Sequence, residues 1–350
     1  MSRTMWALHR RLRRPSVPML CSPAPLAQLA EPMMRSLSPL LNAVMSLVPW
    51  WPAIAAVGAA LLPLHAMAEV DAISVEDDGG RTVTLSRPAE RIVALAPHLV
   101  EMSYAVDAGG QLVGAIEGSD YPPAAAHIDR VGSYRGIPIE LVIAKRPDLV
   151  LAWGSGTPAS LIEQLDRLGI PVYRSEPRRL DQIAGDLRDI GRLSGHDAAG
   201  EKAASRFERE LQRSSQTLSP KPRVFYQLGQ SPLTTLAGGQ IVTQIIRHCG
   251  GEPLFEEAPV LVPQIGWESL LEARPQVILA AGDDDRWKAF WAHHDELPAV
   301  QDGALYTVDR DAISRPGPRM IQAVREVCQA LADAHRKVKG APDRAPPFSG

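Results

Sequence analysis

The chain has 350 residues, a length that suggests about two domains at roughly 100 to 200 residues each and excludes a single small domain. Hydrophobic residues make up 45% of it and charged residues 22%, so it can build a sizeable core and lacks the composition of a disordered chain. Lysine and arginine number 37 against 40 aspartates and glutamates, and this net charge of -3, without a long basic run, argues against nucleic-acid binding.

The N-terminal segment predicts export. From Ser36 to Ala68 it carries no formal charge, contains the apolar run AIAAVGAALL and closes on the small-x-small signal AMA. We expect a signal peptide cleaved after Ala68 rather than a membrane anchor, because prolines interrupt the run and no basic flank follows it. A leader spanning 1–68 exceeds the roughly 15 to 30 residues that such signals need, which favours a true start near Met33 or Met34.

Export also bears on the cysteines. Cys21 falls in the leader, so the mature chain keeps Cys249 and Cys328. Two cysteines in an oxidising compartment usually pair, and two inert buried thiols are the alternative.

The first half of the mature chain predicts an α/β lobe. Alternating apolar residues flank Asp78-Gly79-Gly80, a hairpin pattern, and the strand RIVALAP then leads into a helix, HLVEMSYAV. The strands DLVLAW and IPVY alternate with the helix PASLIEQLDRLG. This alternation is typical of a parallel sheet covered by helices.

Two helices are predicted in the middle of the chain. The segment from Leu180 to Leu193 carries apolar residues on one face, whereas the segment from Asp197 to Leu218 starts at an aspartate cap and has only a narrow apolar stripe. Because its apolar face is so thin, we expect the second helix to bridge two lobes.

A second α/β series follows. It opens with RVFYQLG, includes the strands QVILAAG and ALYTVD, and ends in the helix RMIQAVREVCQALADAHRKV. The expected organisation is a leader at 1–68, an N-terminal α/β lobe at 69–180, a helical linker with the bridging helix at 181–220, a C-terminal α/β lobe at 221–340 and a disordered tail at 341–350.

An internal repeat supports two similar lobes. ELVIAKRPDLVLAW starts at Glu140 and ESLLEARPQVILAAG at Glu268, and in both an arginine lies six positions and a proline seven positions after the glutamate. Each predicts a short helix, a proline stop and a buried strand, with the glutamate in the first helical turn. Helix capping alone would account for the carboxylates; the alternative is a matched pair of docking points.

Catalytic and metal-binding motifs are missing from the sequence. It contains no phosphate loop, no HExxH metal helix and no GxSxG elbow. The mature histidines show no i, i+4 pair, and Asp283-Asp284-Asp285 lacks the alternation of an EF-hand loop. We therefore predict no enzyme, no metal site and no resident cofactor.

Aromatic residues stand at the ends of predicted strands. Tyr121 lies in SDYPP, Tyr134 in GSYRG and Trp153 in LAWGSG. In open α/β sheets, ligands bind outside the carboxyl ends of the strands. We expect these side chains to line a cleft, because the flanking glycines and prolines favour exposed loops over core packing.

Several blocks together resemble the periplasmic cobalamin-binding proteins of ABC importers: SDYPPAA, VGSYRGIPIELVIAKRPDLVLAW, RVFYQLG, HCGGEPLF, PQIGWESLL and REVCQAL. The resemblance extends from about Arg91 to Ala334. It implies two Rossmann-like lobes joined by a single long helix, with the ligand cleft between them. It also implies a periplasmic monomer that is not an enzyme, with a corrinoid and an inner-membrane permease dimer with its ATPase as partners.

The resemblance assigns roles to individual residues. One wall of the cleft would carry the three aromatic residues, and the opposite wall would carry Asp311 and Arg315. Aromatic rings can cover the apolar faces of a corrinoid while polar groups hold its amide-rich edge. Glu140 and Glu268 match carboxylates that dock on permease arginines, one per lobe, and Cys249 and Cys328 match a disulfide.

Three positions depart from the cobalamin binders. Tyr134 stands in place of a larger aromatic, Thr234 in place of a phenylalanine and Val262 in place of a tryptophan. These losses leave room for another corrinoid such as cobinamide, for haem or for a ferric siderophore. For haem, Tyr121 or Tyr134 would ligate the iron, and nothing local in the sequence identifies which. A secreted hydrolase is the remote alternative, and it lacks a recognisable nucleophile and base.

Overall fold

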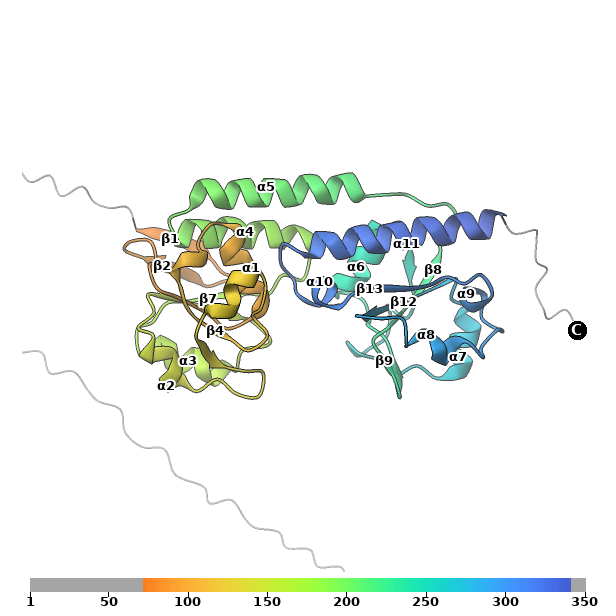
Figure 1. Cartoon of the computed structure of the whole chain (residues 1–350), viewed down its shortest axis with the longest axis horizontal. Helices are drawn as coiled ribbons and strands as arrows, with labels where there is room; N and C mark the ends of the chain where they lie inside the picture. Colours follow the sequence, from red (N-terminus) through yellow and green to blue (C-terminus); the bar gives the residue numbers. More distant parts are fainter. Residues whose placement is uncertain (1–71, 341–350) are drawn as a thin grey trace, which may run out of the picture. The chain divides into compact units, whose positions relative to one another are not determined.

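The computed structural model describes residues 72–340, and Figure 1 shows their helices and strands. The predicted leader, its cleavage site after Ala68 and the tail at 341–350 lie outside this part of the chain. Within residues 72–340, no helix combines the length and the apolar character needed to span a bilayer. The two parallel sheets with flanking helices confirm the predicted α/β class, whereas the residue boundaries of the lobes stay a prediction.

The predicted hairpin opens the described chain. Strands β1 (Ile73–Glu76) and β2 (Thr82–Leu85) pair antiparallel. Asp77 holds the turn, because its carboxylate accepts hydrogen bonds from the backbone N–H groups of Gly79 and Arg81 at 2.9 and 2.8 Å. Arg174 adds an ion pair of 2.7 Å to the same carboxylate.

The N-terminal lobe contains a five-stranded parallel sheet in the order β5-β4-β3-β6-β7. Its strands are β3 (Ile92–Ala94), β4 (Leu112–Ile116), β5 (Arg130–Gly132), β6 (Leu149–Trp153) and β7 (Val172–Ser175). Its helices are α1 (Pro97–Ala105), α2 (Ile139–Ala144) and α3 (Ala159–Arg167), with 3-10 turns η1 (Gly109–Gln111) and η2 (Pro123–His127). The strands are mostly buried, as expected for a sheet covered on both faces.

Helices α4 (Leu180–Leu193) and α5 (Asp197–Ser214) follow. The bounds of α4 match the prediction. Two glycines, one in each helix, let α4 and α5 pack closely. A Cβ on Gly200, for example, would lie 2.9 Å from the carbonyl oxygen of Leu187. Helix α5 also reaches the second lobe, where its Glu210 forms a 2.6 Å ion pair with Arg325 of α11 (Met320–Gly340). This confirms the predicted bridge.

The predicted limits of α5 were wrong at both ends. Asp197 is the first helical residue and not the cap, because His196 occupies the cap position. The helix ends at Ser214 rather than Leu218 because Gln216 bonds with the second lobe instead: its backbone N–H donates to the carbonyl of His248, and its side-chain amide donates to the carbonyls of Cys249 and Cys328.

The C-terminal lobe repeats the plan of the first. Its parallel sheet has the order β11-β8-β12-β13, and a short hairpin of β9 and β10 follows β8. The strands are β8 (Arg223–Gln227), β9 (Gly229–Gln230), β10 (Leu233–Thr234), β11 (Glu252–Pro253), β12 (Val277–Gly282) and β13 (Leu305–Asp309). The helices besides α11 are α6 (Ile241–His248), α7 (Trp267–Ala273), α8 (Lys288–Trp291), α9 (Pro298–Gln301) and α10 (Arg310–Ser314).

The four strands of the second sheet correspond to four of the five strands of the first, around a central strand that is β3 in one lobe and β8 in the other; β5 has no counterpart. The next strand of the same sheet along the chain lies on one side of the central strand (β4 or β11), and β6 or β12 then lies on the other. The repeated segments form α2 with β6 and α7 with β12, which confirms the predicted repeat. A disulfide joins Cys249, just after α6, to Cys328 of α11, as the resemblance implied.

Candidate ligand cleft

The three predicted aromatic residues lie at one edge of the N-terminal sheet. Trp153 is the last residue of β6, Tyr121 follows β4 and Tyr134 follows β5, and these strands run parallel. Their exposed fractions are 39%, 44% and 83%, respectively. Packing in the core, which the sequence left as the alternative, is therefore excluded.

Neighbouring side chains orient the three rings. Trp153 contacts the ring of His98 edge-on, with 6.0 Å between ring centroids. The guanidinium of Arg319 lies 4.1 Å from the centre of the Tyr121 ring. The Tyr134 hydroxyl accepts a hydrogen bond of 3.1 Å from Nε of Arg135. Tyr121 is thus held by a residue of the other lobe, whereas Tyr134 is the most open of the three.

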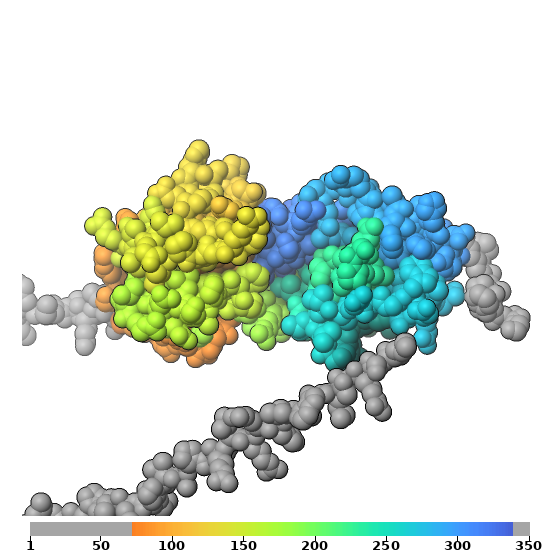
Figure 2. Space-filling view, turned by 90° about the horizontal axis from the view of Figure 1, so that it is seen from below, coloured from red at the N-terminus to blue at the C-terminus, as the bar shows by residue number. Residues whose placement is uncertain are grey.

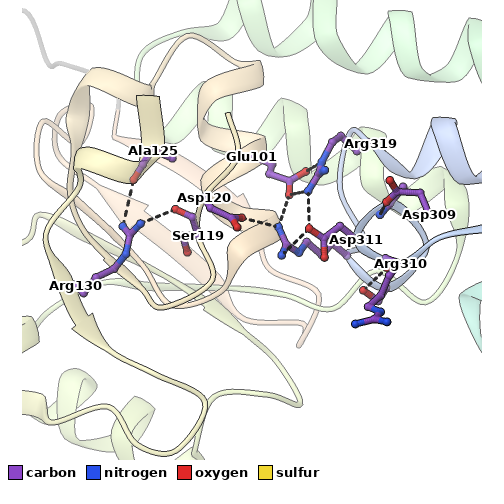
Figure 3. A network of polar contacts seen from close by, with 12 residues as sticks. Glu101, Ser119, Asp120, Ala125, Arg130, Asp309, Arg310, Asp311 and Arg319 are labelled. Atoms are coloured by element: carbon purple, nitrogen blue, oxygen red, sulfur yellow. Dashed lines mark hydrogen bonds and ion pairs between the residues drawn. The ribbon is translucent and has the colours of Figure 1, made fainter. Parts of the chain in front are cut away.

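The predicted polar pair lies next to the junction of the lobes. Arg315 follows α10 and forms an ion pair of 3.0 Å with Asp311. The same guanidinium pairs with two N-lobe carboxylates, Glu101 and Asp120, at 3.3 Å each. Figure 3 shows this network between the lobes. The structure therefore brings Asp311 and Arg315 together, and Arg315 also ties the C-terminal lobe to the N-terminal one.

Glu101 is the centre of the network and was not predicted. It lies in α1, only 4% exposed, and receives two hydrogen bonds of 2.8 and 2.6 Å from the guanidinium of Arg319. This hydrogen-bonded pairing raises the pKa of Arg319 above its usual value. A signal was present in the sequence, because Glu101 is the only charged residue in the apolar segment HLVEMSYAV, and a buried charge needs a partner.

A buried histidine lies beneath Trp153. His98, the second residue of α1, is 3% exposed, and its Nε2 has no hydrogen-bond partner in residues 72–340. Burial, and secondarily the positive charge of Arg315, lower the pKa of His98 to about 3. His98 is therefore neutral at any physiological pH.

The corresponding region of the C-terminal lobe is aliphatic. Its exposed large hydrophobic residues are Leu228, Val260, Leu261 and Val262. They lie beyond the carboxyl end of β8, since Leu228 directly follows that strand and the carbonyl of Leu261 accepts a hydrogen bond from Ala237 just past the β9–β10 hairpin. Figure 2 shows both lobes from the face opposite α5, with the segment around the start of α11 recessed between them.

The repeated glutamates lie in equivalent places. Glu140 and Glu268 are exposed, each in the first turn of its short helix, α2 or α7. Within residues 72–340 neither side chain forms an ion pair or hydrogen bond with another residue. In Figure 1 both helices lie at the end of their lobe that is farther from α5.

The acidic triplet at 283–285 forms ion pairs with basic neighbours. Asp283 pairs with Arg310, Asp284 with Arg286, and Asp285 with Lys288. In the part of the chain that the structure describes, no group of three or more histidine, cysteine, aspartate or glutamate side chains could hold a metal ion.

The chain thus folds into two lobes of one plan that are joined by a helix, with exposed aromatic side chains beyond the strand ends of the first lobe and exposed aliphatic side chains beyond those of the second. The chain belongs to the periplasmic binding protein family, which matches residues 92–312.

Named relatives support this assignment. The chain is 36% identical over 258 residues to the vitamin B12-binding protein of Vibrio parahaemolyticus, covering 72% of this chain and 93% of that one. It is 38% identical over 256 residues to the vitamin B12-binding protein of Vibrio cholerae, covering 71% and 92%.

Solved structures share the fold. The periplasmic vitamin B12-binding protein BtuF of Vibrio cholerae superposes with a TM-score of 0.64 at 36% identity, covering 71% of this chain and 98% of that one. The periplasmic haem-binding protein RhuT of Roseiflexus gives a TM-score of 0.61 at 22% identity, covering 71% and 99%, which shows a common fold alone.

Proposed function

We propose that this chain captures cobalamin or a related corrinoid in the periplasm and delivers it to an inner-membrane ABC importer. One observation carries the proposal: relatives that are 36% to 38% identical, and are covered over 92% to 93% of their length, are vitamin B12-binding proteins. The exposed aromatic residues at the strand ends support it, because a corrinoid offers broad apolar faces to such rings.

In this proposal the two walls act differently on the ligand. Tyr121, Tyr134 and Trp153 cover one ring face, and exposed fractions of 39% to 83% leave part of each side chain accessible to the ligand. Asp311 and Arg315 hold the amide edge, the carboxylate accepting from amide N–H groups and the guanidinium donating to amide oxygens. Arg315 already pairs with three carboxylates, so the ligand would compete with Glu101 and Asp120 for it.

Delivery would use the two exposed glutamates. Glu140 and Glu268 lie on equivalent helices of the two lobes, and a permease dimer offers two equivalent arginine-bearing surfaces. The chain would act as a monomer in the periplasm, after removal of the leader at Ala68. Replacing both glutamates with alanine should leave corrinoid affinity unchanged and abolish transport; a purified double variant with lost affinity would contradict the docking role.

Haem is the second candidate, favoured by the exposed phenols of Tyr121 and Tyr134 and by the haem-binding proteins that share the fold. Arg135 donates a hydrogen bond to the Tyr134 hydroxyl. Of the two tyrosines, Tyr134 is therefore the one whose oxygen is oriented by a neighbouring cation. In this case a tyrosine oxygen would ligate the iron.

The deciding experiment is a titration of the mature protein, from Glu69 onward, with cyanocobalamin, cobinamide and haemin, followed by calorimetry and visible absorbance. One-to-one binding of a corrinoid without a shifted haem Soret band is the expected result. A shifted Soret band with haemin, together with no detectable binding of either corrinoid, would overturn the corrinoid proposal in favour of haem.

A further inference from the structure

The internal repeat contains a second charged residue that the proposed function leaves unused. Arg146 and Arg274 lie six residues after Glu140 and Glu268, at the opposite end of the same short helices. Both arginines are exposed, and within residues 72–340 neither guanidinium has an ion pair or hydrogen bond. At a rise of about 1.5 Å per residue, glutamate and arginine are separated by roughly 9 Å along the helix.

Both arginines have the same unusual backbone conformation. Their φ angles are 47° and 46°, in the left-handed region that favours glycine. A helix that ends in this conformation usually places glycine there. Arginine at this position in both lobes therefore points to a use for the side chain itself, which no contact inside residues 72–340 supplies.

Each lobe fixes this backbone with a second arginine at the start of its central strand. The guanidinium of Arg91 donates to the carbonyls of Lys145 and Arg146 at 2.6 to 3.1 Å. In the other lobe the guanidinium of Arg223 donates to the carbonyl of Arg274 at 3.2 and 3.0 Å. The end of each helix, and with it the exposed arginine, is thus held on the sheet.

The residue two positions after each exposed arginine completes the same construction. The carboxylate of Asp148 accepts from the backbone N–H of Arg91 at 3.2 Å, and the amide oxygen of Gln276 accepts from that of Arg223 at 3.0 Å. The two lobes expose different side chains at their strand ends, yet both hold the helix that carries the glutamate and the arginine with the same set of hydrogen bonds.

We infer that Arg146 and Arg274 are a second pair of docking charges. Each lobe presents a carboxylate at one end of its short helix and a guanidinium at the other, and the permease subunit that it contacts carries an acidic side chain opposite the arginine. The opposed charges fix the orientation of each helix on the permease, because a reversed helix would place like charges together. This inference rests on the proposed delivery to an importer.

The test is binding of the mature R146G/R274G variant to the permease–ATPase complex of the organism's corrinoid importer in nanodiscs. We expect the Kd to rise about tenfold and its salt dependence to become shallower, since contacts between charges at an interface rim govern both. Corrinoid affinity should not change. The thermal midpoint should stay level or rise, because glycine accepts the left-handed conformation.

Two further variants serve as controls. R209A/R213A removes the same number of charges from α5, where both arginines are exposed and have no ion pair with the rest of the described chain, and should bind the importer as the wild type does. R146K/R274K keeps the charges and should recover most of the affinity.

Three results would overturn the inference: an unchanged Kd for R146G/R274G, an equal loss in R209A/R213A, or a lowered thermal midpoint that accompanies the weaker docking. If E140A/E268A loses importer binding while R146G/R274G does not, the docking glutamates stand and only the arginine pair is refuted. If both variants bind normally, the proposed docking itself is wrong.

Discussion

The two lobes are alike in one helix with its anchoring residues and different in the side chains that they expose beyond the ends of their strands. Helices α2 and α7 share a glutamate, a left-handed arginine and a strand arginine that holds the helix end. At the carboxyl ends of the strands the N-terminal lobe exposes aromatic rings, whereas the C-terminal lobe exposes aliphatic side chains.

The difference follows from what each of these regions contacts under the proposed function. A dimeric permease presents the same surface twice, so the docking helices gain from remaining equivalent. A corrinoid has two unlike faces and one edge, so the cleft walls gain from diverging. Each of the following experiments removes one element of this asymmetry or of the connection between the lobes.

The largest effect is expected at the connection. Glu101→Gln leaves Arg319 and Arg315 without their shared buried carboxylate, and breaking a buried pair typically costs about 3 kcal/mol or more of unfolding free energy. Denaturant titration should show that loss and separate unfolding of the two lobes. Asp311→Asn is the control, because its side chain is 43% exposed and such pairs contribute at most about 1 kcal/mol. One transition at the wild-type midpoint would show that Glu101 does not couple the lobes.

The aromatic side chains of the N-terminal lobe should contribute more to ligand affinity than the aliphatic side chains of the C-terminal lobe. Trp153→Ala should weaken cyanocobalamin binding about 100-fold, which corresponds to roughly 2.7 kcal/mol and is typical of a tryptophan hot spot. Leu261→Ala, on the aliphatic wall, should weaken it by about threefold or less. Calorimetry on both variants measures the ratio, and equal losses would remove the distinction between the walls.

Acid should lower the stability of the protein through His98, the buried residue beneath Trp153 in the N-terminal lobe. His98 is neutral in the folded protein down to a pKa of about 3, whereas in the unfolded chain it protonates near pH 6.5. Because its pKa is lower in the folded protein, the contribution of His98 to the free energy of unfolding is fully present above about pH 6.5 and is lost as the pH falls below that value. The loss is about 1.4 kcal/mol per pH unit and therefore about 2 kcal/mol at pH 5.

His98→Phe should remove this dependence while keeping a ring against Trp153. Unfolding free energies of both proteins at pH 7 and pH 5 give the comparison. Asp186, whose pKa burial raises to about 8, contributes equally to both proteins and cancels in the difference. An identical loss of stability between the two pH values in wild type and variant would contradict the assignment to His98.

Local patterns predicted what local forces determine. The bounds of α4 follow from its apolar periodicity, and the exposure of Tyr121, Tyr134 and Trp153 follows from flanking glycine and proline. The end of α5 did not follow, because Gln216 finds its partners in a segment far along the chain. Glu101 was missed for the same reason: Arg319 lies 218 positions away in sequence.

The equivalent anchoring of α2 and α7 could be predicted only in part from the sequence. The spacing of glutamate, arginine and proline revealed the repeat, but the strand arginines Arg91 and Arg223 precede it by dozens of residues and in different contexts. Only the pairing of β3 with β6 and of β8 with β12 brings each of them to its helix end.

The smallest effect should come from making the two walls more alike. Val262→Trp adds a ring to the aliphatic wall, where Val262 is 48% exposed. One stacked ring should tighten cyanocobalamin binding about tenfold, or roughly 1.4 kcal/mol. Leu168→Trp is the matched control, because Leu168 is 57% exposed at the end of α3 and should not alter affinity. If Val262→Trp instead weakens binding, the small side chains of this wall accommodate ligand volume, and the asymmetry of the cleft is steric rather than a missing stacking contact.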